Sequence, residues 1–137
     1  MGEITVEVDR ASVGMADDTH PHTETWHFST DSFVGEILLH ALESYELPSN
    51  YSWLMAARLA PEAEWQDVAL FSWDDWSTRQ QLRLYVLLYG WDRTLREWAG
   101  EDSTIEIFFN TVRQDTPENM RKWFAYRRGG PSPFERR

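Results

Sequence analysis

The hydrophobic pattern changes its period along the chain, and this change limits the folds that the chain can adopt. Residues 3–13 begin with a strict alternation of apolar and polar side chains (ITVEVD), as in a β-strand with one buried face. Residues 23–28 (TETWHF) alternate again. From Val34 to Tyr45, in contrast, apolar side chains recur every three or four positions, which predicts an amphipathic helix. The chain is therefore expected to begin with a β-hairpin followed by a helix, capped by a hydroxyl from residues 29–30.

The later segments continue this order. Residues 81–89 (QLRLYVLLY) are interpreted as a strand, although their composition also suits a helix. The further strands are expected at residues 53–59, 67–73, 81–89 and 105–112, and the further helices at 93–99 and 116–127. The order strand, strand, helix, strand, strand, strand, helix, strand, helix predicts an α+β fold. We expect a mixed β-sheet with helices packed on one face and a β-grasp-like start (strand-strand-helix-strand-strand).

Length and composition favour one folded unit. With 137 residues, of which 42% are hydrophobic, the chain can bury a single core, so residues 1–128 are predicted to form one α+β domain. Residues 129–137 (GGPSPFERR) are expected to be a flexible basic tail. Cysteine is absent, which excludes disulfides and thiolate chemistry. The N-terminus lacks an export signal and no stretch approaches the roughly 20 apolar residues that span a bilayer, which favours a cytoplasmic location.

Charge is divided unevenly along the chain. Residues 1–78 contain seven Asp and eight Glu against two Arg, whereas residues 79–137 contain eleven Arg or Lys against eight acids. The formal net charge of the whole chain is −10. Because an unpaired buried charge is costly, most of these carboxylates are expected in water or against a cationic partner. The favoured partner is a basic protein, since nucleic acids and anionic membranes are polyanions, and no small-molecule substrate is indicated.

The most distinctive local feature is Trp73-Asp74-Asp75-Trp76, two adjacent acids between two large amphipathic rings. This combination is typical of an interface with aromatic anchors surrounded by charge. The alternative is that Trp73 belongs to the core, the acids form a turn and Trp76 covers an edge. The candidate partner-binding residues are Asp17, Asp18, Glu62, Glu64, Asp74, Asp75 and Trp76.

Histidines and carboxylates crowd into residues 17–27, and both are ligands of Zn or Mn. In an extended strand, however, His22 and Glu24 share one face and His27 points to the other, so a polar hairpin loop is the simpler interpretation. His20, His22 and His27 remain weak metal candidates, and no metal or other cofactor is expected. The chain has no Gly-rich phosphate loop, no G-x-S-x-G and no H-E-x-x-H, so no catalytic residue and no enzymatic activity are predicted.

The stretches ITVEVDRASVGMADDTHPHTETWHF, LPSNYSWLMAARL and DVALFSWDDW resemble small actinobacterial-type proteins that include immunity proteins of polymorphic toxin systems. The resemblance covers Ile4 to Trp76 and includes Asp9, Arg10, Ser12, Asp17, Asp18, Leu47, Pro48 and Trp53. It implies a cytoplasmic inhibitor that binds and occludes a cognate, basic toxin, for which complementary charge accelerates encounter. Two alternatives remain: a β-grasp-like adaptor or scaffold module in a multiprotein assembly, and a metal-dependent enzyme that uses the His20–His27 segment.

Overall fold

The computed structural model confirms the predicted α+β fold and the predicted order of elements. It describes residues 2–12, 22–48, 51–75, 80–86, 90–100, 103–112 and 117–127. The elements are β1 (Glu3–Arg10), β2 (Glu24–Ser29), α1 (Gly35–Ser44), β3 (Ser52–Arg58), β4 (Gln66–Asp75), β5 (Gln80–Val86), α2 (Leu95–Ala99), β6 (Thr104–Val112) and α3 (Pro117–Arg127). The β-grasp-like start is therefore present, and the described part of the segment that also suited a helix belongs to strand β5, whereas residues 87–89 lie outside the described residues. The predicted tail, residues 129–137, lies outside the described residues.

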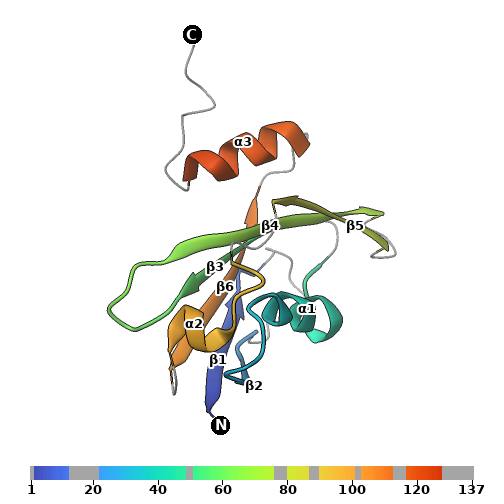
Figure 1. Ribbon diagram of the computed structural model, residues 1–137. Helices are drawn as coiled ribbons and strands as arrows, with labels where there is room; N and C mark the ends of the chain where they lie inside the picture. Colours follow the sequence, from blue (N-terminus) through green and yellow to red (C-terminus); the bar gives the residue numbers. More distant parts are fainter. Residues whose placement is uncertain are drawn as a thin grey trace.

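The strands form one mixed sheet in the order β2-β1-β6-β3-β4-β5 (Figure 1). Strands β1 and β6 are parallel, and all other neighbouring pairs are antiparallel. The last strand thus enters the middle of the sheet, between the first strand and β3. This central position buries one face of β6 completely, because Ile105, Ile107 and Phe109 alternate inward.

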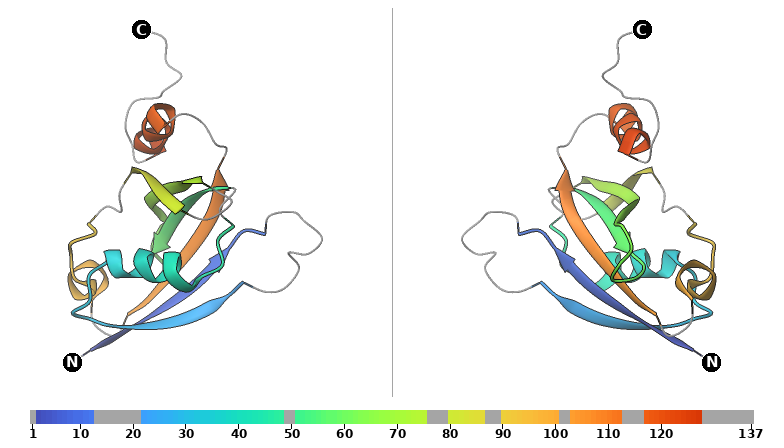
Figure 2. Two further views of the ribbon diagram at one scale, coloured as in Figure 1. Left: turned by 90° about the vertical axis from the view of Figure 1, so that its right-hand side faces the viewer. Right: turned by 90° about the vertical axis from the view of Figure 1, so that its left-hand side faces the viewer.

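The main core lies between the sheet and helix α1. Ile37, Leu38 and Ala41 form the buried stripe of α1, as the predicted helical periodicity requires. The strands contribute Ile4, Val6, Val8, Trp53, Met55, Ala57, Phe71, Ile105, Ile107 and Phe109 to the same cluster. In the side views of Figure 2 the sheet curves around α1. Helix α2 adds Leu95 to this core, so α1 and α2 cover the same face of the sheet.

Helix α3 packs on the opposite face of the sheet, so the expectation that the helices pack on one face only was wrong. Met120 and Phe124 contact Leu54 of β3 and Leu70 of β4, which are register partners. The residues next to these leucines point into the main core, so this part of the sheet is apolar on both faces and needs a cover on each. Figure 1 shows α3 above β4 and β5, on the side away from α1. No helix in the described ranges is long and apolar enough to cross a membrane.

The start of α1 differs from the sequence-based expectation. The helix begins at Gly35, several residues after the expected hydroxyl caps, and its N-cap residue Val34 makes no side-chain capping bond. Instead, the backbone N–H groups of Val34 and Gly35 donate to the carbonyl oxygens of Arg93 (2.8 Å) and Trp91 (3.0 Å). The segment before α2 therefore accepts hydrogen bonds from two backbone donors at the start of α1 that have no partner within the helix. Such a cap comes from distant sequence and leaves no local signature.

Truncation of Phe124 tests the second packing layer. Phe124 is fully buried, so we expect Phe124→Ala to lower the free energy of unfolding by about 3–5 kcal/mol. Tyr126 on the same helix is 46% exposed, and Tyr126→Ala is expected to change stability by less than about 0.5 kcal/mol. Urea unfolding followed by circular dichroism measures both. Equal effects of the two variants would contradict the packing of α3 on the sheet.

Candidate binding surface

The face of the sheet turned away from α1 carries rows of charged side chains across neighbouring strands. Glu7 in β1, Glu106 in β6 and Arg58 in β3 are register partners and lie side by side. Their side chains point outward, because the residue that precedes each of them is buried in the main core. Two carboxylates on adjacent strands repel each other, and the neighbouring guanidinium offsets that repulsion.

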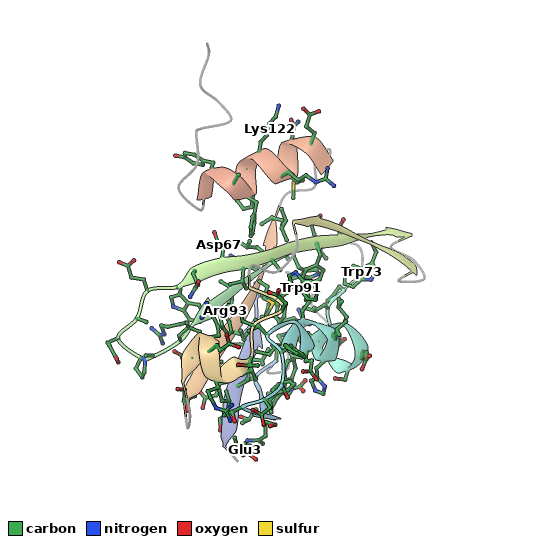
Figure 3. The ribbon with its side chains drawn as sticks, viewed as in Figure 1. Glu3, Asp67, Trp73, Trp91, Arg93 and Lys122 are labelled. Carbon is green, nitrogen blue, oxygen red and sulfur yellow. The ribbon has the colours of Figure 1, made fainter. Side chains whose placement is uncertain are left out.

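A second row crosses the same strands one step further along. Asp9 of β1 pairs with Phe108 of β6, which pairs with Ala56 of β3, which in turn pairs with Asp67 of β4. Figure 3 labels Asp67 on the side of β4 away from α1. We call this region, with the adjoining turn between β3 and β4, the acidic sheet face. It comprises Glu3, Glu7, Asp9, Arg58, Glu62, Glu64, Trp65, Asp67, Glu106 and Phe108.

Arg58 is the arginine of the acidic sheet face, and it is held by two neighbours. Its Nε donates a hydrogen bond to Oε2 of Glu106, and its Nη2 forms an ion pair with the same oxygen. Its guanidinium lies 5.0 Å from the centroid of the Trp65 ring, a cation–π distance. Trp65 itself is 46% exposed. The guanidinium of Arg58 is thus bound by neighbouring side chains of the protein itself. The remaining carboxylates of this face and the Trp65 ring are open to solvent.

The Arg58–Glu106 pair fixes the ionisation of Glu106. The hydrogen bond from Arg58 holds the pKa of Glu106 below its ordinary value of 4.5, and the same bond raises the pKa of Arg58. A general acid at neutral pH needs a raised pKa instead. Glu106 therefore suits electrostatic binding better than proton donation.

A shallow hollow of about 250 Å³ lies in the acidic sheet face. Its lining includes Glu7, Asp9, Trp65, Glu106 and Phe108. Pockets for small-molecule ligands usually measure roughly 300–1,000 Å³, so this hollow is at the small end. Its size and charge suit one cationic side chain of a docked protein, with the aliphatic stem against the rings.

The histidines of the candidate metal segment separate as extended geometry requires. His27 Nδ1 lies 3.1 Å from Oε1 of Glu3 on β1, on the outer face. His22 is buried, and its backbone carbonyl accepts a hydrogen bond from the Tyr45 hydroxyl at 2.6 Å. His20 lies outside the described residues. Within the described ranges, no three His, Asp or Glu side chains form a group that could hold a metal ion.

Some of the predicted partner-binding residues lie within the described residues, and others do not. Glu62 and Glu64 are exposed in the turn between β3 and β4, which is part of the acidic sheet face. Asp74 and Asp75 belong to the end of β4 and not to a turn, and Asp75 pairs with Gln80 of β5. Trp73 is a core residue, 5% exposed. Asp17, Asp18 and Trp76 lie outside the described residues.

Sequence reasoning missed the centre of the acidic sheet face. The alternation of β1 marks Glu7 and Asp9 as outward residues, and the same pattern marks Glu106 in β6. Each was therefore recognisable as exposed. Their proximity was not, because it depends on the parallel pairing of the first and last strands, for which a single sequence contains no signal.

Comparison with protein-family models, with curated proteins and with solved structures found no match to this chain.

The lowered pKa of Glu106 predicts a pH-dependent contribution to stability. A carboxyl group whose pKa is lower in the folded chain stabilises the fold above its unfolded pKa and loses this effect as pH falls through the folded pKa. We therefore expect wild-type protein to be more stable than Glu106→Gln near neutral pH. The difference in the free energy of unfolding should shrink below about pH 4.5.

Urea unfolding of both proteins over a range of pH measures this difference. The control is the same pair of proteins in an Arg58→Met background, which retains an aliphatic stem against Trp65 but removes the hydrogen bond. There the pH-dependent difference should be much smaller. A difference that is constant from neutral to acid pH would contradict the assigned role of Arg58.

Proposed function

We propose that this protein is a cytoplasmic immunity or inhibitor protein that binds a basic toxin and occludes it with the acidic sheet face. The main support for this proposal is the arrangement of Glu7, Glu106 and Arg58 in one row beside the exposed ring of Trp65. Carboxylates outnumber the one arginine among the residues of this face. The resemblance to immunity proteins that we infer from the sequence of residues 4–76 implies the same function.

The chemistry of the acidic sheet face supports fast docking. An inhibitor must capture its toxin before damage occurs, and complementary charge raises the rate of encounter. Trp65 supplies a large rigid ring of the kind that dominates the energy of protein interfaces. Arg58 contributes to the shape of the surface, because Glu106 and Trp65 hold its guanidinium in place.

Occlusion without catalysis has a stoichiometric consequence. An inhibitor that acts by occlusion stays bound to its target, so each molecule should inactivate one toxin molecule. Titration of the purified toxin domain encoded by a neighbouring gene should therefore reach full inhibition at equimolar protein. Complete inactivation of a large toxin excess by a small amount of this protein would contradict the proposal and indicate an enzyme.

Charge reversal tests whether the acidic sheet face is the docking site. We expect Glu62→Lys/Glu64→Lys to slow association with the toxin domain by about tenfold or more and to weaken its salt dependence. Both side chains are exposed, so the fold should tolerate the change. Stopped-flow fluorescence at increasing salt concentration measures the association rate.

The matched control is Glu43→Lys/Glu46→Lys, a double reversal of exposed acids at the end of α1 and just after it, on the other side of the sheet. It changes the net charge by the same amount and should slow association less. Equal slowing by the two double variants would show that net charge acts without a defined docking face, which contradicts the proposal.

A further inference from the structure

A second surface with different chemistry lies on the other side of the sheet, between α1 and the segment that precedes α2. It is a groove of about 420 Å³ with an apolar inner surface. Phe33, Leu39 and Trp91 line it and are 51%, 57% and 56% exposed. These are three of the five large hydrophobic side chains that are exposed in the described part of the chain. Clustering of this kind marks interaction sites, whereas single exposed apolar residues are ordinary.

Backbone hydrogen bonds join the two segments that form the groove, residues 32–35 and 91–95. Gly35 N–H donates to Trp91 O, Val34 N–H to Arg93 O, and Leu95 N–H to Ser32 O, at 2.8–3.0 Å. Figure 3 labels Trp91 and Arg93 on the segment that runs beside α1. These bonds make the position of Trp91 relative to α1 a property of the fold and not of a loose loop.

Two further features fix the positions of α1 and of the segment before α2, which form the two walls of the groove. A Cβ atom on Gly35 would lie 3.2 Å from the carbonyl oxygen of Trp91, so glycine permits this close approach. At the start of α2, Thr94 and Glu97 form a capping box that anchors the other end of the segment. A preformed groove loses little conformational entropy when a ligand binds.

Carboxylates, and no cations, accompany the apolar lining of the groove. Glu36 and Asp92 are its two charged lining residues among those described. The carboxylate of Glu36 is held in place by the backbone N–H of Phe33, which donates to its Oε2 at 2.5 Å. The nearby Arg93 is directed elsewhere, because its Nη2 donates to the carbonyl oxygen of Glu97 at 2.9 Å. The groove therefore combines an apolar floor with a negative rim.

We propose that this groove docks a cationic amphipathic segment of a partner protein. Apolar side chains of the segment lie against Phe33, Leu39 and Trp91, and its flanking Lys or Arg side chains face Glu36 and Asp92. The inference does not depend on the proposed function, since the groove and the acidic sheet face lie on opposite faces of the sheet. A domain bound to one of these surfaces leaves the other accessible.

Charge distinguishes this occupant from the main competitors. A second copy of the chain, docked symmetrically, would bring two equivalent pairs of carboxylates together, and this repulsion disfavours it. A small apolar molecule would find few polar groups to fix its orientation. A cationic segment uses both the apolar lining and the rim.

Selection from a random peptide library displayed on phage tests the proposal with the full-length protein as bait. Selected peptides should combine aromatic or aliphatic residues with flanking Lys or Arg. Their synthetic, fluorescein-labelled forms should bind wild-type protein at least about tenfold more tightly than Leu39→Ala/Trp91→Ala, as expected for a buried aromatic anchor. Fluorescence anisotropy measures both affinities.

Two controls separate the groove from the rest of the surface. Trp65→Ala removes an exposed tryptophan of the acidic sheet face and should leave peptide affinity unchanged. Asp92→Asn should weaken binding and flatten its salt dependence. Thermal unfolding shows whether each variant is folded.

Several outcomes would overturn the proposal. One is a library that yields no peptides, or peptides without a cationic bias. Another is peptides that bind Leu39→Ala/Trp91→Ala as well as wild type. Concentration-dependent dimerisation of wild-type protein that these two substitutions abolish would assign the groove to a second copy instead.

Discussion

The parallel pairing of β1 with β6 is the constraint on which the rest of the structure depends. It joins the first strand of the chain to the last strand and places both inside the sheet. On the inner face it aligns two rows of branched aliphatic side chains, which form the surface that α1 covers. On the outer face the same register places Glu7 beside Glu106 and Asp9 beside Phe108. One pairing thus determines both the core and the acidic sheet face.

Local patterns in the sequence predicted the elements but not their contacts. The alternation in β1 and the helical spacing in α1 depend on which side of one element is buried, and both predictions were confirmed. The helix start was misplaced because its capping groups are backbone carbonyls of Trp91 and Arg93, which are remote in sequence. The sequence of β4 is apolar on both faces, and the structure covers the second face with α3. A helix on only one side of the sheet was expected there.

The candidate site was predictable to a similar extent. The acidic, aromatic character of the surface was expected, and Glu62 and Glu64 belong to the face that displays it. Trp73, for which an anchor and a core position were the two alternatives, is in the core, whereas Trp65 is exposed and contacts Arg58. Trp65 directly precedes β4 and Trp73 lies within it, and the burial of each ring depends on the neighbouring strands and helices. A single sequence does not contain that information.

The division of charge along the sequence is not the division of charge on the surface. Glu106 comes from the cation-rich part of the chain, yet it lies in the acidic row, and Arg58 from the acid-rich part binds it. Asp31 and Arg96 form a further pair between the two parts, at 2.8 Å. Because screening limits electrostatic attraction to about 10 Å at ordinary salt, a partner responds to the groups around its contact site and little to the net charge of −10. The acidic sheet face and the carboxylate-rimmed groove are therefore two separate negative surfaces, one mainly polar and one mainly apolar, and we propose a different kind of cationic ligand for each.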